Sequence, residues 1–376
     1  MPSVREIAEI ANVSIGTVSR VLNNQPHVSE KARAKVLKAA NAIRDDVAVV
    51  NRKATTSIAL VYRGESSLYS EFDASILHGV VTELEQTNHD LVIINADRGR
   101  DSGESLGQML LRRGVAGALL RTVRSTRDMC VDLAEARFPT VIIADEFDSP
   151  HVGSVRASSA GSIQRGLEHL IHLGHRKIAI GLNEIDDFDH AERLTVYREV
   201  LHSAGLSIEP EWIIRGPAYT ASGGATLRQL MSLPNRPTAI FVTDPALGEG
   251  LAVEALRMGV RIPRELSVVG FDDSNRRFAT FPRLSSICQN TDLLGRTAIQ
   301  HLLGIIAKTA EPQRLRLECC FEPLDSTAPP IEDMRRVAEL GEELVREGYR
   351  IVPVRGMGET VLGAVVVSGW RRSSSP

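Results

Sequence analysis

The chain has 376 residues, of which 43% are hydrophobic and 24% are charged, and its formal net charge is −3. This length predicts about two or three domains, and the composition is that of a globular protein with a substantial apolar core. A slightly acidic chain is not a general polyanion binder, and no apolar run reaches the length of a membrane span. Because a charged amphipathic helix begins the sequence, we expect no signal peptide and a cytoplasmic protein.

The charge is distributed unevenly along the chain. Residues 1–57 contain nine Lys or Arg and five Asp or Glu, a net charge of +4, which leaves −7 for the remaining residues. A basic end on an acidic body favours a separate module that binds nucleic acid.

The first segment, SVREIAEIANVSIGTVSRVL at 3–22, predicts two short helices joined by a tight turn. Ser3 and Glu6 have the spacing of a capping box for the first helix. Asn12 stands where that helix must end, and asparagine tolerates the left-handed backbone conformation that such an end needs. Ser14 is a candidate cap for the second helix, so the segment predicts a helix-turn-helix.

The second helix leaves small, hydroxyl and Arg side chains on its outer face. Arg can read guanine through two parallel hydrogen bonds, and Ser or Thr hydroxyls can reach phosphates in a major groove. The alternative is an ordinary helical hairpin with a solvated face. We expect Arg20 to be the main base reader and Ile15 to contact a thymine methyl group. The predicted DNA-binding residues are Ser14, Ile15, Gly16, Thr17, Ser19, Arg20 and Asn23.

A third helix is predicted from about residue 30 to 43, where apolar residues at helical spacing can close a small three-helix core. Its outward Lys and Arg side chains either contact phosphates or form a solvated basic face. Residues 45–57 follow as a linker.

From residue 57 the pattern changes to apolar strands that alternate with amphipathic helices, which is typical of parallel sheets covered on both faces. Strands are predicted at 57–62, 90–97, 115–121, 140–145, 177–182, 212–216, 238–244, 266–273, 285–290 and 314–324. Helices are predicted at 74–87, 105–113, 129–136, 160–173, 191–204, 223–233, 247–258 and 292–307. The order repeats after about residue 160, so we predict two α/β subdomains with a cleft between them.

Two groups of motifs carry a family resemblance: VSIGTVSRVLN followed by HVSEKARAKV in the headpiece, and HLIHLGHRKIAIGL, RPTAIFVTD and GVRIPRELSVVGFDD in the core. With these motifs the chain resembles the LacI/GalR family of bacterial transcription regulators. The resemblance implies a homodimer, a periplasmic-binding-protein-like core whose chain crosses three times between its subdomains, and a small effector in the cleft. In that family the linker carries a hinge helix that enters the minor groove. Here the linker is shorter, and Asp45 and Asp46 would repel phosphate.

The resemblance also places an effector site in the cleft. Arg193 and Asp272 match the family best, and such a pair can hold hydroxyls or a carboxylate by charge-assisted hydrogen bonds. The alternative for each is a surface ion pair. The full predicted set is Phe72, Asp73, Asp145, Arg193, Thr243, Asp244 and Asp272. Because carboxylates accept hydrogen bonds from hydroxyls, a sugar or polyol is the expected effector.

This chain departs from the family at several of these positions. Thr243 stands before Asp244 where an Asn is common, and Ser70 and Glu71 replace a usual Asn-Pro. An Asp that is common near the segment SVRASSAG is absent.

No motif for catalysis or for a metal is convincing. The histidines at 169, 172 and 175 are three residues apart, a spacing that drifts around a helix, and the glycines at 248 and 250 lack the rest of a dinucleotide fingerprint. The cysteines at 130, 288, 319 and 320 have no metal or redox spacing, so we expect buried, reduced thiols. We expect no cofactor, no metal and no enzymatic activity.

After residue 328 the chain continues beyond the part that resembles the family. Residues 331–348 have the pattern of an amphipathic helix, and 349–354 and 359–370 have the pattern of two strands. This extension could drive association beyond a dimer, pack against its own core, or add strands to a sheet edge.

The sequence therefore predicts an α/β protein with four parts: a three-helix headpiece at 1–44, a linker at 45–57, a core of two doubly wound α/β subdomains at 58–328, and an extension at 329–376. The expected function is a sequence-specific regulator, in first place a repressor, that binds double-stranded operator DNA and a small carbohydrate effector. The alternatives are a cytoplasmic small-molecule sensor with weak DNA binding, and, less favoured, an enzyme built on the α/β core.

Overall fold

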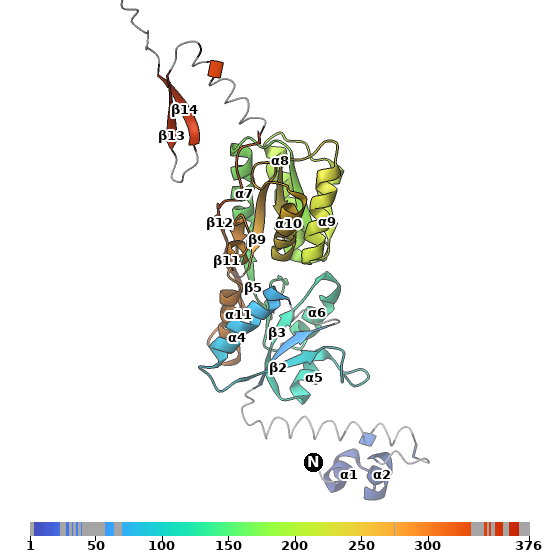
Figure 1. The fold of residues 1–376 in the computed structure, drawn as a ribbon. Coiled ribbons are helices and arrows are strands. Elements are labelled where there is room, and N and C mark those ends of the chain that lie inside the picture. The colour runs from blue at the N-terminus through green and yellow to red at the C-terminus, as the bar shows by residue number, and fades with distance from the viewer. Residues whose placement is uncertain are drawn as a thin grey trace, which may run out of the picture. The chain divides into compact units, whose positions relative to one another are not determined.

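The computed structural model of the chain describes residues 4–22, 28–29, 32, 35–36, 39, 57–63, 70–273, 275–331, 342–343, 346, 350–355 and 361–367. The predicted linker, apart from Ser57, lies outside this set, and so does most of the predicted third helix of the headpiece. Nearly all of the helix predicted at 331–348 also lies outside it. Figure 1 shows the described elements with their labels.

The headpiece contains the two predicted helices, α1 (Val4–Ala11) and α2 (Ile15–Leu22). Asn12 has the left-handed conformation expected at the end of α1, with a φ of 48°. Ser14 caps α2, because its hydroxyl oxygen accepts a hydrogen bond from the backbone N–H of Thr17 at 3.2 Å. The buried apolar residues form one cluster: Ile7, Ala8, Ala11, Val18, Val21, Val36 and Ala39.

The core contains two six-stranded sheets, which we call lobe 1 and lobe 2 together with the helices that cover them. The sheet of lobe 1 has the order β11-β5-β4-β3-β1-β2. Its strands are β1 (Ser57–Tyr62), β2 (Asp90–Asn95), β3 (Val115–Arg121), β4 (Thr140–Ile143), β5 (Gly153–Ser158) and β11 (Arg314–Glu318). Its helices are α4 (Glu71–Leu84), α5 (Leu106–Arg112), α6 (Asp128–Glu135) and α11 (Thr291–Ile306).

Lobe 2 has the strand order β12-β10-β9-β8-β6-β7, in which β12 runs antiparallel to β10. Its strands are β6 (Ile178–Asn183), β7 (Ile213–Gly216), β8 (Ala239–Val242), β9 (Ser267–Asp272), β10 (Ser285–Cys288) and β12 (Cys320–Glu322). Its helices are α7 (Ala160–His172), α8 (Phe188–Ser203), α9 (Thr220–Ser232) and α10 (Pro245–Met258).

The chain crosses between the lobes three times, as the resemblance implied. It leaves β5 of lobe 1 for α7, which packs on the sheet of lobe 2, and it leaves β10 of lobe 2 for α11, which packs on β4 and β5. It then passes from β11 in one sheet to β12 in the other at Cys319. These crossings tie the two lobes together at one edge.

Two predictions about elements were wrong. The hydrophobic pattern does not predict β5, because this fully enclosed strand carries buried polar side chains such as Ser154 and Arg156 in place of an apolar run. The single strand predicted at 314–324 is two strands in different sheets, since the chain changes lobes at Cys319. The helix predicted at 74–87 begins earlier, because α4 starts at Glu71, so that Phe72 and Asp73 lie in its first turn.

The two strands predicted in the extension are present as β13 (Arg350–Arg355) and β14 (Val361–Val367). They pair antiparallel with each other as a two-stranded sheet, with Arg350 opposite Val367.

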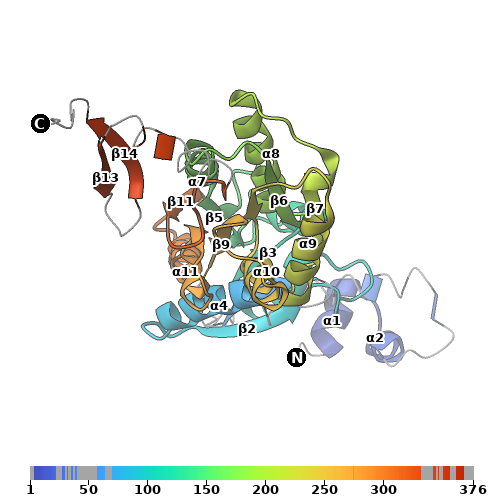
Figure 2. The same cartoon turned by 45° about the horizontal axis from the view of Figure 1, so that its top comes forward.

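Glycine allows the close packing of one helix pair in each lobe, α4 with α11 and α9 with α10, which lie side by side in Figures 1 and 2. A methyl group at Gly79 would overlap the backbone carbonyl of Asp292, and one at Gly295 would overlap that of Ile76. Because the obstacles are backbone atoms, a larger residue has to push the helices apart.

We predict that Gly295→Ala lowers the free energy of unfolding by about 1–3 kcal/mol, the usual cost of overpacking, as measured by urea denaturation. The matched control is Gly161→Ala in α7, where the nearest atom to the added methyl is the mobile end of Arg165 at 3.7 Å. We expect the free energy of unfolding of the control variant to rise by up to about 1 kcal/mol, because alanine reduces the entropy of the unfolded chain. Equal stability of the two variants would contradict this account of the α4–α11 contact.

Candidate functional site

The carboxyl ends of the two sheets meet, which brings the loops after their strands into one site. The backbone N–H of Arg124, which follows β3, donates to the carbonyl of Asp186, which follows β6, at 3.1 Å, and their side chains pair at 3.2 Å. On the same border Arg156 of β5 lies 3.4 Å from Glu192 of α8. Ligands of such open α/β sheets bind beyond the carboxyl ends of the strands, so this border is the candidate effector site.

Arg193 of α8 lies in lobe 2, and the residue is only 4% exposed. Its Nη1 donates to the carbonyl of Thr243 at 2.6 Å, and its guanidinium lies 3.7 Å from the centre of the Phe271 ring. Among the described residues, no acceptor is bonded to its Nε. A buried donor without an acceptor is costly, so this unsatisfied Nε is an exception among the polar atoms of the site.

The residues that begin α8 surround this guanidinium with acidic groups. Asp187 caps the helix and accepts hydrogen bonds at 2.8 Å from the backbone N–H and from Nδ1 of His190. Burial opposes the ionisation of Asp187, but these bonds outweigh it and leave its pKa below the usual range. Asp189 lies 3.9 Å from Arg193, and burial raises its pKa to about 6.

On the lobe 1 side, Phe72 and Asp73 are brought together by Arg121, which ends β3. The Arg121 Nε donates to Asp73 at 2.8 Å, and the guanidinium lies 5.0 Å from the centre of the Phe72 ring. Ser70 caps α4 and donates its hydroxyl to the other oxygen of Asp73 at 2.7 Å. Arg121 is therefore a cationic partner of Phe72 and Asp73 that was not predicted from the sequence.

Asp145 and Asp272 are each engaged by a neighbouring arginine of their own lobe. Asp145 pairs with Arg127 at 2.8 Å and accepts the hydroxyl of Thr122 at 2.9 Å. Asp272 pairs with Arg277 and accepts the backbone N–H of Arg276 at 2.8 Å. Together with the pair formed by Asp73, all three carboxylates have an arginine partner.

Thr243 and Asp244 lie where β8 passes into α10. The Thr243 side chain is fully buried, and its hydroxyl donates to the carbonyl of Gly181 at 3.1 Å. Asp244 caps α10 by accepting the N–H of Ala246 at 3.0 Å, and it accepts the amide of Asn183 at 3.4 Å. These contacts position the turn between β8 and α10, whose Thr243 carbonyl accepts the hydrogen bond from Arg193.

Gln289 and Asp273 also lie at these strand ends, although the sequence did not predict them as site residues. Gln289 follows β10, and its amide nitrogen donates to Asp273 at 2.5 Å, while its Oε1 is buried without a donor among the described residues. Burial raises the pKa of Asp273 to about 7, although the bond from Gln289 opposes the shift. Asp272 was predicted from the family resemblance, whereas the signal that could have identified Gln289 is a polar residue at the carboxyl end of a parallel strand.

The outer face of α2 carries the residues predicted to contact DNA. Ile15 is 51% exposed, and Arg20 is exposed as well. Gly16 and Ser19 are exposed, and Thr17 is half-buried with its hydroxyl 2.9 Å from that of Ser14. Asn23 lies outside the described residues.

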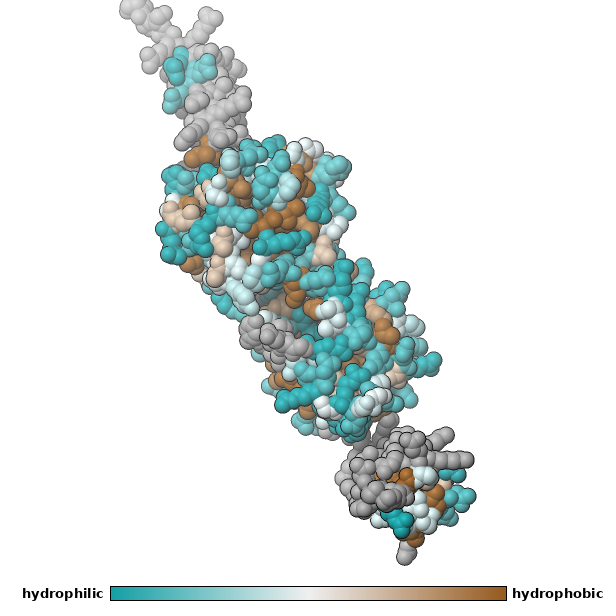
Figure 3. Space-filling model, turned by 90° about the vertical axis from the view of Figure 1, so that its right-hand side faces the viewer, coloured by the Kyte–Doolittle hydropathy of each residue, from teal (hydrophilic) through white to brown (hydrophobic). Residues whose placement is uncertain are grey.

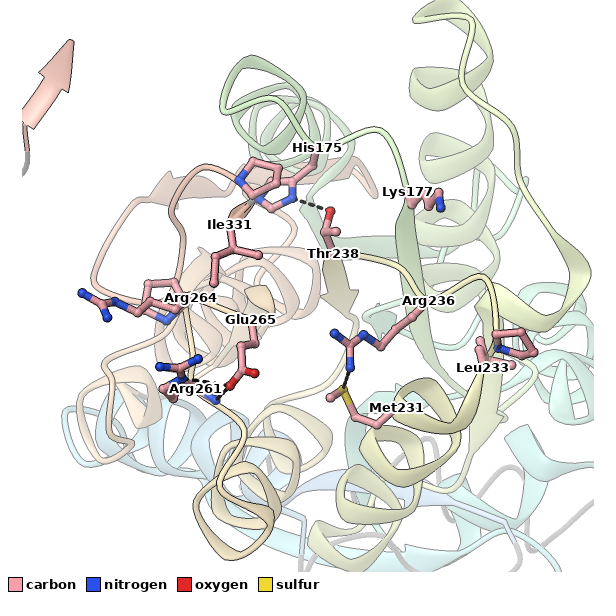
Figure 4. A pocket seen from close by; sticks show the side chains of 13 residues that line it. His175, Lys177, Met231, Leu233, Arg236, Thr238, Arg261, Arg264, Glu265 and Ile331 are labelled. Carbon is pink, nitrogen blue, oxygen red and sulfur yellow. Dashed lines mark hydrogen bonds and ion pairs between the residues drawn. The ribbon is translucent and has the colours of Figure 1, made fainter. Parts of the chain in front are cut away.

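A separate pocket of about 500 Å³ lies at the amino ends of the lobe 2 strands, at the other end of this sheet from Arg193. Figure 4 shows its basic and apolar side chains, with Arg261 paired to Glu265 at 3.0 Å and His175 bonded to Thr238 at 2.8 Å. No residue predicted for effector binding lines this pocket.

The remaining predictions concern histidines, cysteines and membrane spans. In the described part of the chain, no group of three His, Cys, Asp or Glu side chains is arranged to hold a metal ion. All four cysteines are free thiols; Cys130 and Cys319 are buried as expected, but Cys288 is half-buried and Cys320 is exposed. No described helix is both long and apolar enough to cross a membrane.

Comparison with known proteins gives matches to both parts of the chain. Residues 3–44 match the family of bacterial regulatory proteins described as lacI family, and residues 167–327 match the periplasmic binding protein-like domain. The HTH-type transcriptional repressor PurR of Escherichia coli O139:H28 (strain E24377A / ETEC) is 28% identical over 345 residues, which cover 89% of this chain and 100% of that repressor.

Solved structures give the same result. The transcriptional regulator CelR in complex with cellobiose is 31% identical, with a TM-score of 0.63, and the match covers 87% of this chain and 100% of that one. The lac repressor dimer bound to operator and the anti-inducer ONPF is 24% identical with a TM-score of 0.64, over 87% of this chain and 99% of that one, and it shows the fold alone.

The raised pKa of Asp273 predicts a pH-dependent stability. An acid whose folded pKa is above its unfolded value destabilises the folded state as pH rises from about 4 through 7, because ionisation then costs more in the fold. We expect Asp273→Asn, which keeps the acceptor for Gln289, to raise the free energy of unfolding by about 1–3 kcal/mol at pH 8 and to leave it unchanged below pH 4.

The matched control for this measurement is Asp325→Asn. The surface pair with Arg283 lowers the pKa of Asp325, so its stabilising effect exists above pH 4 and is lost as pH falls. The control should therefore lose stability at pH 8, opposite in sign to Asp273→Asn. Urea denaturation at several pH values measures both, and a loss of stability in Asp273→Asn at pH 8 would refute the assignment.

Proposed function

Because the chain belongs to the lacI family of bacterial regulatory proteins, we propose that it is a sequence-specific repressor of transcription whose binding to operator DNA is controlled by a small polyhydroxy effector. Members of this family are DNA-binding transcriptional regulators, and this function requires no catalytic group in the core. The observation that carries the proposal is the combination of an exposed recognition face on α2 with Arg193, a buried and incompletely bonded arginine of lobe 2.

The recognition face has the chemistry that reads a major groove. Arg20 is placed to form the bidentate pair with guanine, Ile15 to contact a thymine methyl, and Gly16 to permit close approach. Ser14, Thr17, Ser19 and Asn23 would contact phosphates or base edges. The capped turn before α2 and its buried Val18 and Val21 hold this face rigid, which supports specific over purely electrostatic binding.

Apolar residues on the surface of lobe 2 support a homodimer. Leu256 of α10 is 61% exposed and Phe281 is 78% exposed, and Val253 and Phe278 are exposed as well. The segment that contains Phe278 packs beside α10, so these side chains can form one patch. Exposed apolar patches mark protein interfaces, and a two-fold dimer would present two recognition helices to a near-palindromic operator. Figure 3 shows apolar side chains among hydrophilic ones on one face of the molecule.

A neutral polyhydroxy compound fits the effector site best. Its hydroxyls can donate to Asp189, Asp244 and Gln289, and a hydroxyl or ring oxygen can accept from Nε of Arg193. The ring of Phe72 can cover an apolar sugar face. An anionic effector is disfavoured, because Asp187 and Asp189 lie near Arg193 and already balance its charge. One solved relative at 31% identity is bound to cellobiose, which makes a disaccharide a reasonable first probe.

The first test is selection of binding sites from random duplex DNA with the purified protein, followed by titration of the selected site at two salt concentrations. A near-palindromic site bound far more tightly than random DNA supports a dimeric specific regulator. Weak binding that depends steeply on salt and not on sequence would instead support the alternative, a small-molecule sensor with weak DNA binding.

We predict that Arg20→Ala weakens binding to the selected site by about 1–3 kcal/mol and relaxes the preference at one base position. The comparison variant is Lys35→Ala on the exposed surface of the headpiece, which should weaken binding to all sequences alike and reduce the salt slope. Fluorescence anisotropy with the selected site and single-base variants separates these outcomes. An Arg20→Ala protein with unchanged affinity and preference would contradict the assignment of Arg20.

We predict that Arg193→Lys retains operator binding but loses the response to the effector found in a panel of mono- and disaccharides. Lysine keeps the charge but has no Nε–H to offer the ligand and cannot form the fixed hydrogen-bond geometry of arginine. The control is Arg283→Lys, since Arg283 pairs with Asp325 on the surface. Calorimetry measures effector binding directly, and an unchanged dissociation constant in Arg193→Lys would show that the effector binds elsewhere.

A further inference from the structure

Strand pairing at the edge of lobe 2 places two cysteines directly opposite each other. β10 and β12 run antiparallel, and Cys288 is the register partner of Cys320. Side chains of opposed residues lie on the same face of a sheet, with Cβ atoms about 4.5–5.5 Å apart. A disulfide needs Cβ atoms about 3.5–4.5 Å apart and Cα atoms about 4.4–6.8 Å apart, so a small inward movement allows the bond.

The two thiols differ in their surroundings in a way that suits oxidation in two steps. Cys320 is exposed and Cys288 is half-buried, and both line a cavity of about 640 Å³. Burial raises the pKa of Cys288 to about 12, although Arg277 opposes this shift. Since the thiolate is the form that reacts with oxidants, the exposed Cys320 is the first to react, and Cys288 is within reach to resolve the product.

The other two cysteines are poorly placed for this chemistry. Cys319 is 5% exposed, and burial raises its pKa to about 12. Cys130 is buried in α6 of lobe 1, away from β10 and β12. Cys288 and Cys320 are thus the two thiols that the pairing of β10 with β12 brings together.

We propose that Cys288 and Cys320 are an oxidation site at which a peroxide converts two thiols into a reversible disulfide across β10 and β12. The Cys320 thiolate attacks one peroxide oxygen, which yields a sulfenic acid and hydroxide. The Cys288 sulfur then attacks the sulfenic sulfur; its proton and the sulfenic hydroxyl leave as water. In total, two thiols and one hydrogen peroxide give one disulfide and two waters. An external thiol returns the pair to the reduced state by exchange.

The position of the pair connects it to the site between the lobes. Cys288 ends β10 directly before the crossing to α11, and Cys320 begins β12 directly after the crossing from β11. Arg277 pairs with Glu322, which follows Cys320 by two residues, and with Asp272 of the effector site. A disulfide would therefore fix the lobe 2 ends of two of the three crossings. On the basis of the proposed function, we expect it to alter the effector response.

The first experiment detects the bond without any assay of DNA or effector. The reduced full-length protein is treated with hydrogen peroxide, its free thiols are alkylated, and tryptic peptides are mapped by mass spectrometry. We expect a linked pair of peptides, residues 284–296 and 317–335, that disappears after treatment with dithiothreitol, and loss of most alkylation at both cysteines.

Because residues 317–335 include both Cys319 and Cys320, variants are needed to assign the bond. Cys319→Ser and Cys130→Ser should still form the linked peptides, whereas Cys288→Ser and Cys320→Ser should not. The proposal is overturned by a bond that requires Cys319, by a link between two protein molecules on non-reducing gels, or by alkylation that peroxide does not change. Native circular dichroism of each variant identifies any that fail to fold, and Cys288→Ala and Cys320→Ala replace those.

The second experiment measures the effector response of reduced and oxidised protein on the selected operator, with Cys320→Ser as the control that peroxide should not affect. We expect the oxidised wild-type protein to show a shifted effector midpoint. If the disulfide forms and the midpoint does not move, the link to regulation is refuted while the oxidation site stands. If no operator is found at all, the proposed function fails, but the peptide map still decides the oxidation site.

Discussion

The three crossings between the lobes are the constraint on which the candidate site depends. They hold the two mainly parallel sheets so that the carboxyl ends of the parallel strands face a common border, where Arg124 of lobe 1 bonds to Asp186 of lobe 2. Because every loop after a parallel strand emerges on that border, residues far apart in sequence, such as Asp73, Arg193 and Gln289, are gathered without a dedicated binding loop. In each lobe, glycine lets one pair of helices pack closely, α4 with α11 and α9 with α10.

The site is rich in ions that are mostly already paired. Asp73, Asp145 and Asp272 each have an arginine partner. Removing one partner of a buried ion pair destabilises a protein strongly because it leaves an unpaired buried charge, although the intact pair itself adds little stability. The paired groups are better suited to fixing the shape of the site than to capturing a charged ligand. The unsatisfied atoms, Nε of Arg193 and Oε1 of Gln289, are a donor and an acceptor, which is the combination that a hydroxyl group can satisfy.

The edge of lobe 2 combines features that are separate in sequence. Among the described strands of its sheet, β12 is the one that runs antiparallel, and this direction sets Cys320 opposite Cys288 and Glu322 near Arg277. Arg277 in turn holds Asp272 at the border between the lobes. A chemical change at the cysteine pair therefore has a short path, through side chains in contact, to the predicted effector site.

The sequence alone determined the helix-turn-helix and most of the α/β elements, because caps, left-handed turn residues and apolar periodicity are local signals. Ser14 and Asn12 have the roles that local chemistry predicts, and most strands follow continuous apolar runs. The sequence could not show β5, whose buried Arg156 and Ser154 have partners only in the folded sheet, or the division of 314–324 between two sheets. Likewise, the arginine partners of the predicted acids and the opposition of Cys288 and Cys320 depend on strand register and on crossings between lobes. These are long-range pairings that no local pattern encodes, so only the tertiary structure decided them.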